Sequence, residues 1–175
     1  MLFVDADERV TPALRDEIGT VLARPEPGWW IPRDNYIFGR LTRHAGWYPD
    51  YQLRLLRPGL THYDPLRPVH ELPVLDSPLP PGHLRAALVH LNYESVPEFI
   101  AKQREYAVYD ARQLLAGGAR ARARSFVLQP LRQFYWRWVT LAGWRAGWHG
   151  LRLSVLMAYF ELQKYRQLRA LQRGL

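Results

Sequence analysis

The chain begins with three apolar residues, Leu2-Phe3-Val4, that run directly into the acidic segment Asp5-Ala6-Asp7-Glu8. The apolar run predicts a short buried strand, and a buried strand needs hydrogen-bonded partners on both sides. Open α/β sheets bind their ligands at the carboxyl ends of the strands, where the chain turns and neighbouring side chains converge. We therefore expect an α/β fold with a ligand site at Asp5 and Asp7.

The remaining segments predict further helices and strands. Thr11 followed by Pro12 is typical of a helix start, and Ser95 with Glu98 three residues later forms a capping box at the start of another helix. Apolar spacing and turn residues set the other boundaries. The expected elements are a helix over 11–25, strands over 29–41, 51–56 and 85–91, a helix over 95–116, and helices over 129–142 and 150–172.

Charge divides the chain unevenly. The 175 residues carry a formal charge of +8, yet the segment from Arg120 onward holds eleven Lys and Arg and a single acid, a net of +10. The first 119 residues are therefore nearly neutral, at −2. We expect two regions: a globular part over 1–118, and a basic, aromatic-rich helical extension over 119–175.

The extension interleaves arginine with large amphipathic rings, a composition suited to the headgroup region of a membrane. Its candidate membrane-interfacial residues are Trp136, Trp138, Trp144, Arg137 and Arg145. Two simpler readings remain open: a solvated arginine-rich helix face, and a helical hairpin whose aromatic side chains form core. A third alternative, nucleic-acid binding, has only charge and aromatic content in its favour and shows no RNA- or DNA-reading motif.

Several classes of protein are excluded or disfavoured by composition. The chain has no cysteine, which excludes disulfides and thiolate metal sites. The opening residues show neither a basic region nor a long apolar run, so no signal peptide is predicted. The longest apolar run, 153–160, is far shorter than the ~20 residues that span a bilayer. We expect a cytoplasmic protein at the inner face of the cytoplasmic membrane.

The acidic segment is the first candidate for chemistry. Two carboxylates after a buried strand are costly to hold together unless a cation neutralises them, and Mg²⁺ or Mn²⁺ bridging to phosphate oxygens suits Asp5 and Asp7. A solvated acidic turn ahead of a helix would look the same. His90, at a strand end, is a candidate third ligand or substrate donor, and Glu71, beside His70 in a proline-rich stretch, is a candidate general base. A structural histidine at a strand end and a surface loop pair are the respective alternatives.

A second candidate site lies on the strand over 51–56. Gln52 and Arg54 alternate with Leu53 and Leu55, so the amide and the guanidinium share one face. Such a pair can read phosphate or sugar hydroxyls. An exposed edge-strand face is the alternative explanation.

Taken in order, several segments resemble family-2 glycosyltransferases of the GT-A fold, most closely those acting on lipopolysaccharide core or related surface glycans. The resemblance covers essentially the whole chain. Its segments are Leu-Phe-Val-Asp-Ala-Asp-Glu-Arg-Val at 2–10, Pro-Arg-Asp-Asn-Tyr-Ile-Phe-Gly at 32–39, Gly-Trp-Tyr-Pro-Asp-Tyr-Gln-Leu-Arg-Leu at 46–55, Val-His-Glu at 69–71 and His-Leu-Asn-Tyr at 90–93.

The resemblance implies inverting transfer of a sugar from a nucleotide-sugar donor to a glycan or lipid-linked acceptor. Asp5 and Asp7 match the family's Asp-x-Asp motif, which holds the divalent cation on the diphosphate, and His90 matches a third ligand. Glu71 matches the catalytic base. Gln52 and Arg54, with His70, match segments that line the substrate.

Members of that family carry an N-terminal half, with the first strands of the sheet and the nucleotide pocket, ahead of the Asp-x-Asp strand. This sequence shows no counterpart, so the resemblance implies an incomplete GT-A mixed sheet followed by amphipathic helices. A misassigned start, a truncated gene or a separate chain would each explain it. We expect residues 1–175 alone to bind nucleotide sugar poorly. The competing hypothesis is a catalytically inactive peripheral membrane or interaction module.

Overall fold

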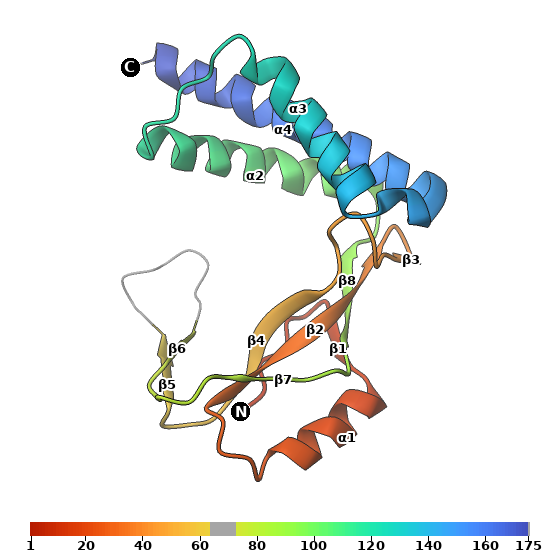
Figure 1. Cartoon of the computed structure of the whole chain (residues 1–175), viewed down its shortest axis with the longest axis vertical. Coiled ribbons are helices and arrows are strands. Elements are labelled where there is room, and N and C mark those ends of the chain that lie inside the picture. Colours follow the sequence, from red (N-terminus) through yellow and green to blue (C-terminus); the bar gives the residue numbers. More distant parts are fainter. Residues whose placement is uncertain (64–72, 175) are drawn as a thin grey trace. The chain divides into compact units, whose positions relative to one another are not determined.

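A computed structural model describes residues 1–63 and 73–174 (Figure 1). Strands fill the first half of the chain and helices the second, which confirms the mixed α/β class. The chain forms two compact units. Unit 1 comprises Met1–Tyr36 and Tyr48–Asn92, and unit 2 comprises Ile37–Trp47 and Tyr93–Leu175. The expectation that the sheet is an incomplete GT-A sheet stays a prediction.

The main sheet has six strands in the order β1-β8-β2-β3, and β4 and β7 also pair with β2. Their bounds are β1 Glu8–Val10, β2 Gly28–Ile37, β3 Arg40–Leu41, β4 Asp50–Leu56, β7 Gly82–His83 and β8 Leu88–Tyr93. β1 pairs antiparallel with β8, and β4 antiparallel with β2, whereas β7 runs parallel to β2. A separate two-stranded sheet joins β5 (Thr61–Tyr63) to β6 (Pro73–Leu75).

Helix α1 (Pro12–Val21) covers part of this sheet in unit 1. Thr11 accepts a hydrogen bond from the backbone N–H of Leu14 at 3.1 Å, and Pro12 occupies the first turn, so the predicted helix start is confirmed. The helix ends at Val21, before the predicted stop at residue 25. Its apolar side chains join strand residues in one core cluster: Leu14, Val21, Trp29, Ile31, Leu55, Leu84 and Leu88.

The opening residues do not form the predicted buried strand. Leu2 makes an isolated antiparallel bridge to Leu55, and the Phe3 N–H donates to the Arg54 carbonyl oxygen at 2.9 Å. Val4 is exposed. The segment is bonded to β4 along one side, which places it at an edge of the sheet and leaves it only partly covered.

Two strand boundaries also differ from prediction. The strand expected over 29–41 is interrupted, because Phe38 and Gly39 take positive φ angles of 53° and 72° and turn the chain from β2 into β3. Such paired positive φ angles suit a tight hairpin turn. The strand expected over 85–91 lies at β8, Leu88–Tyr93, whereas β4 agrees with its predicted range to within one residue.

Unit 2 contains helices α2 (Val96–Ala116), α3 (Ser125–Tyr135) and α4 (Gly147–Arg173), with a π-helical turn, Trp136–Thr140, and a 3₁₀ turn, Gly143–Ala146, between the last two. Its core consists of Ile37, Tyr93, Phe99, Leu153 and Phe160. The ring of Phe99 lies 4.7 Å from that of Tyr93 and 6.2 Å from that of Phe160, at edge-on angles that aromatic pairs prefer.

The predicted capping box of α2 is confirmed with one change. Ser95 accepts from the Glu98 N–H at 3.3 Å, but the Glu98 carboxylate bonds the N–H of Glu94, at 2.9 Å, one residue earlier than expected. The segment 37–47 is tied to α4 by a buried hydrogen-bonding pair, Thr42 Oγ1 and His149 Nε2, 2.8 Å apart.

The last two helices begin earlier than the sequence predicts. We expected a helix over 129–142, yet α3 begins at Ser125 and contains Pro130. The Ser125 N–H is bonded to the Arg122 carbonyl oxygen at 2.9 Å. The π turn closes through a bond of 2.8 Å from the Leu141 N–H to the Trp136 carbonyl oxygen. α4 starts three residues before the predicted position.

Unit 2 contains α2 together with α3 and α4. The predicted division into a globular part over 1–118 and a basic helical extension over 119–175 was drawn from charge and composition. It stays a prediction. Within residues 1–63 and 73–174, none of the helices has the length and apolar content needed to cross a bilayer.

Candidate functional site

The acidic segment is anchored by Glu8, whose side chain is fully buried in unit 1. Glu8 Oε1 accepts hydrogen bonds from Arg33 Nη1 at 3.3 Å and from Arg54 Nη2 at 3.1 Å. Its Oε2 accepts from the backbone N–H of Asp5 at 3.0 Å. A buried carboxylate is tolerated only when it is paired and hydrogen-bonded in this way. Glu8 therefore fixes the turn that presents Asp5 and Asp7.

Arg54 joins this buried anchor to the first aspartate of the motif. Its Nη2 donates to Asp5 Oδ2 as well as to Glu8. Burial lowers the pKa of Arg54, but the charges of Glu8 and Asp5 outweigh burial and raise that pKa above its usual value. The structure thus places Arg54 beside the Asp-x-Asp motif, with its guanidinium engaged by carboxylates. Its predicted contact with substrate stays a prediction.

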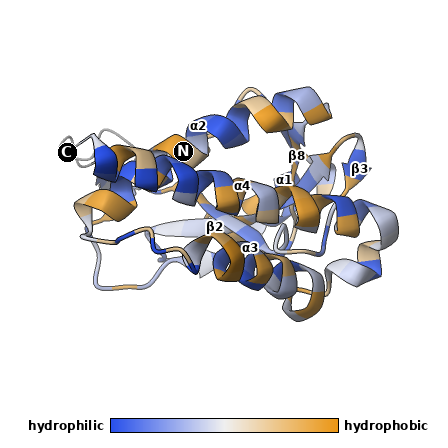
Figure 2. Cartoon of the chain, turned by 90° about the horizontal axis from the view of Figure 1, so that it is seen from above, coloured by the Kyte–Doolittle hydropathy of each residue, from blue (hydrophilic) through white to orange (hydrophobic). Residues whose placement is uncertain are grey.

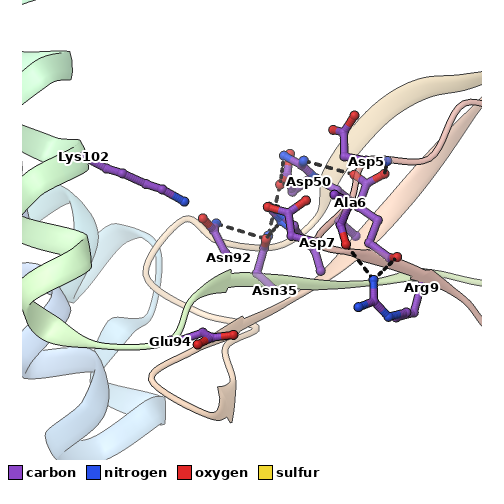
Figure 3. A network of polar contacts seen from close by, with 12 residues as sticks. Asp5, Ala6, Asp7, Arg9, Asn35, Asp50, Asn92, Glu94 and Lys102 are labelled. Carbon is purple, nitrogen blue, oxygen red and sulfur yellow. Dashed lines mark hydrogen bonds and ion pairs between the residues drawn. The ribbon is translucent and has the colours of Figure 1, made fainter.

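Asp50, at the start of β4, is the centre of a second group of bonds (Figure 3). Its Oδ2 accepts from Arg33 at 2.6 Å and from Asn35 Nδ2 at 3.0 Å, and its Oδ1 accepts from Gln52 Nε2 at 2.9 Å. Burial raises the pKa of Asp50, but the Asn35 bond, the charge of Arg33 and the Gln52 bond together hold the pKa below its ordinary value. Gln52, a predicted substrate contact, orients Asp50 here.

Asp50 determines which way the buried Asn35 amide points. Because the Asp50 carboxylate can only accept, Asn35 must turn its NH₂ group toward it and its Oδ1 away. That oxygen lies 2.6 Å from His90 Nδ1 and accepts from Asn92 Nδ2 at 3.3 Å. His90 Nδ1 must therefore carry the proton that it donates to Asn35.

His90 in turn faces Asp7. The antiparallel pairing of β1 with β8 sets Glu8 opposite His90, and the Leu91 N–H donates to the Asp7 carbonyl oxygen at 2.9 Å. His90 Nε2 lies 3.4 Å from Asp7 Oδ2. Burial lowers the pKa of His90 and the charge of Arg33 lowers it further, against the raising effect of Asp7 and Glu8, and the net direction is down. At neutral pH the imidazole is neutral, with its lone pair on Nε2 toward the carboxylate.

Two lone-pair atoms that face each other at this distance suit a shared cation. A neutral histidine whose other nitrogen donates to a fixed acceptor is the usual form of a histidine ligand. Mg²⁺ is typically held by one or two carboxylates together with waters and substrate phosphates. Asp7 fits that donor set, whereas His90 would add an imidazole nitrogen to it. Asp5 would become a third ligand only if its carboxylate released Arg54 and bound the metal instead.

The structure therefore brings together two of the three predicted ligands. Among the described residues, no group of three or more histidine and carboxylate side chains is arranged to hold a metal ion. The predicted base Glu71 and its neighbour His70 lie outside the described residues. The site also contains residues that were not predicted from the sequence: Glu8, Arg33, Asn35, Asp50 and Asn92.

The predicted membrane-interfacial residues of unit 2 fall into two groups. Trp136, Trp144 and Arg145 are exposed, and the Arg145 guanidinium lies 5.8 Å from the Trp144 ring centre. Trp138 is partly buried and stacks on Phe134 at 6.3 Å.

Arg137 is turned into the unit. Its Nη1 donates to the Ala45 carbonyl oxygen at 2.6 Å, and its guanidinium lies 5.5 Å from the Trp47 ring centre. Burial lowers the pKa of Arg137 to about 10, so the side chain remains charged at neutral pH.

Comparison with known proteins shows a similarity to a glycosyltransferase. The chain is 29% identical over 180 residues to the lipopolysaccharide core biosynthesis glycosyltransferase LpsC of Rhizobium meliloti (strain 1021). The alignment covers 97% of this chain and 64% of the length of that relative. No family model matches the sequence, and no solved structure matches the chain.

Proposed function

We propose that this chain carries the site of an inverting, metal-dependent glycosyltransferase of family 2, with a GT-A fold. The reaction transfers a sugar from a nucleotide-sugar donor to a hydroxyl of a cell-surface glycan or lipid-linked acceptor at the inner face of the cytoplasmic membrane. Similarity to a glycosyltransferase along almost the whole chain supports the reaction class.

The observation that carries the proposed chemistry is the approach of Asp7 Oδ2 to the neutral His90 Nε2. Asp7 and His90 would hold Mg²⁺ or Mn²⁺, with Asp5 as the third ligand. The cation offsets the negative charge that grows on the nucleotide diphosphate as it leaves.

The surrounding residues keep this arrangement ready before substrate binds. Asn35 holds the His90 ring in the required tautomer, and Glu8 holds the turn that carries both aspartates. Prior ordering of this kind lowers the free-energy cost of reaching the transition state, since little has to move as charge develops.

The transfer step itself is assigned by resemblance. Glu71 removes the proton of the acceptor hydroxyl, whose oxygen attacks the anomeric carbon on the face opposite the leaving nucleotide diphosphate. The bond to the acceptor oxygen forms as the bond to the diphosphate oxygen breaks, which inverts the anomeric configuration. His70 contacts the substrate beside Glu71.

Manganese binding followed by electron paramagnetic resonance, with and without a panel of nucleoside diphosphates, tests the metal site. We expect one tightly bound Mn²⁺ in the presence of diphosphate, reduced at least tenfold in affinity by Asp7→Asn or His90→Gln. Asp16→Asn, an exposed carboxylate on α1, is the matched control and should bind like the parent chain.

Release of nucleoside diphosphate from nucleotide sugars, in the presence of a lipopolysaccharide-type acceptor, tests the reaction. Turnover that needs Mg²⁺ or Mn²⁺ and is lost in Asp7→Asn supports the proposal. Unchanged metal affinity and turnover in Asp7→Asn and His90→Gln would overturn it. A chain that binds no metal but still binds membranes would favour the inactive interaction module.

A further inference from the structure

Helix α3 directs its apolar residues outward. Val127, Leu128, Leu131 and Tyr135 are 59%, 56%, 59% and 62% exposed. At 100° per residue these four positions fall within about one third of the helix circumference. The outward side of α3 therefore carries these four apolar side chains as one stripe. Figure 2 shows hydrophobic residues, in orange, among more polar ones along α3.

The inward side of the same helix is more polar than its outward side. Ser125 is buried, and Gln129 Oε1 is buried with no hydrogen-bond partner within residues 1–63 and 73–174. Gln133 is also partly covered. A surface helix of a globular protein normally shows the opposite arrangement, with its apolar stripe on the core. The exposed stripe is thus unexplained by the packing of unit 2.

Large apolar side chains remain exposed in the segments that follow α3. Trp136 and Val139 are exposed in the π turn, Trp144 in the 3₁₀ turn and Trp148 in the first turn of α4. Tryptophan is enriched where an apolar surface meets the polar headgroups of a bilayer. We refer to the α3 stripe together with these four residues as the exposed apolar face.

The charge around this face points to an anionic partner. From Ala111 to Phe160 the sequence has eight arginines and no aspartate or glutamate. Arg120, Arg122 and Arg124 line a hollow of about 540 Å³ at the start of α3, together with Ser125 and Tyr165. Arg132 lies on α3 beside the stripe, and Arg145 near Trp144.

A second copy of the chain is a poorer fit for this face. Joining two copies through it would bring two sets of arginines together without a carboxylate from this segment to offset them. Phospholipid phosphates supply that negative charge, and acyl chains accept leucine, valine and tryptophan side chains.

We propose that α3 and the exposed apolar face lie in the interface of an anionic phospholipid bilayer, with the arginines at the start of α3 among the lipid phosphates. The helix lies along the membrane surface. This inference depends on unit 2 alone and is independent of the proposed sugar transfer.

Vesicle co-sedimentation tests the proposal, with the purified chain and vesicles of phosphatidylcholine alone or mixed with phosphatidylglycerol. We expect at least tenfold stronger partitioning onto the mixed vesicles, weakened by added salt. The double substitution Leu128→Gln and Leu131→Gln should weaken binding by roughly tenfold or more, because the glutamines remove apolar surface from the acyl region.

The matched control is Leu22→Gln, since Leu22 is 55% exposed but lies in unit 1. It should bind like the parent chain. Arg122→Gln with Arg124→Gln should reduce the preference for anionic vesicles, whereas Arg104→Gln on α2 should not. All of these positions are exposed, so circular dichroism should show unchanged helix content.

A second measurement needs no variant. Lipids with brominated acyl chains should quench the tryptophan fluorescence of the bound chain, since the exposed tryptophans lie close to those chains. The proposal would be overturned by vesicle binding that the leucine double substitution leaves unchanged. It would also be overturned by a dimer in solution, without lipid, that the same substitution dissociates.

Discussion

Asn35 and His90 are hydrogen-bonded in the interior of unit 1, with 2.6 Å between Asn35 Oδ1 and His90 Nδ1. Asn35 donates to Asp50 on its other side, so its amide cannot turn over without losing that bond. The bond leaves His90 Nε2 facing Asp7. An asparagine that was not among the predicted site residues therefore controls which nitrogen a metal would meet.

Asn35→Ala should lower Mn²⁺ affinity by roughly tenfold or more, because partners that orient a histidine ligand contribute that much. Isothermal titration calorimetry with and without nucleoside diphosphate measures the change. Asn92→Ala is the control, since Asn92 donates to the same Asn35 oxygen and, in the part of the chain that the structure describes, forms no hydrogen bond with His90. Equal losses in the two variants would contradict a specific role for Asn35.

Glu8→Gln should destabilise the chain by about 2–3 kcal/mol, because it removes a buried charge that two arginines surround. Arg33 and Arg54 keep Asp50 and Asp5 as partners, which limits the loss. Urea unfolding followed by circular dichroism measures the effect. Asp16→Asn, in an exposed pair with Arg15, should change stability by less than about 1 kcal/mol.

Stability should fall at alkaline pH because of Tyr93. Burial raises the pKa of Tyr93 to about 12, against the lowering effect of a hydrogen bond from Gln103. A raised pKa in the folded state means that folding favours the neutral phenol. The contribution of Tyr93 to stability is therefore complete below about pH 10 and is lost as the pH rises toward about 12. The loss should reach about 2 kcal/mol.

Urea unfolding at pH 8, 10 and 11.5 tests this dependence. Tyr93→Phe should flatten it, whereas Tyr135→Phe, at a well-exposed position on α3, should leave it unchanged. A slope that persists in Tyr93→Phe would assign the alkaline loss to other groups.

Gly150→Ala should destabilise the chain by at least about 2 kcal/mol. A Cβ at residue 150 would overlap the carbonyl oxygen of Gly143, which is backbone and cannot move aside independently. Gly19→Ala in α1 is the matched control, because nothing lies within 4 Å of its Cβ position. That substitution should stabilise the chain by about 0.5–1 kcal/mol. Thermal unfolding would distinguish the two, and similar behaviour would contradict the close approach of Gly143 and Gly150.

Local signals in the sequence predicted the helix starts at Thr11 and Ser95, because capping depends on residues three or four positions apart. They failed at the start of α3, which was predicted at residue 129 but lies at Ser125, because no side-chain cap marks that start. They also failed at Leu2-Phe3-Val4, since apolar character alone does not show how many sides of a strand are covered.

The candidate site was predicted in part. Asp5, Asp7 and His90 were identified from their residue types, but the role of Glu8 depends on bonds to Arg33 and Arg54, which lie 25 and 46 residues away along the chain. One local signal for Asn35 was available. Ile31, Arg33, Asn35 and Ile37 alternate along β2 on one face, and polar residues between two buried isoleucines indicate a buried polar group.

The bond between Thr42 and His149 has a consequence for biosynthesis. Residues 37–47 leave the ribosome long before the α4 residues that cover them, and 107 residues separate the two partners of this bond. At ~5–20 residues per second, the delay is roughly 5–20 s. During that time Ile37 and Trp47 have none of their partners from α4, so the nascent chain exposes an apolar segment that chaperones would be expected to shield until α4 has been synthesised.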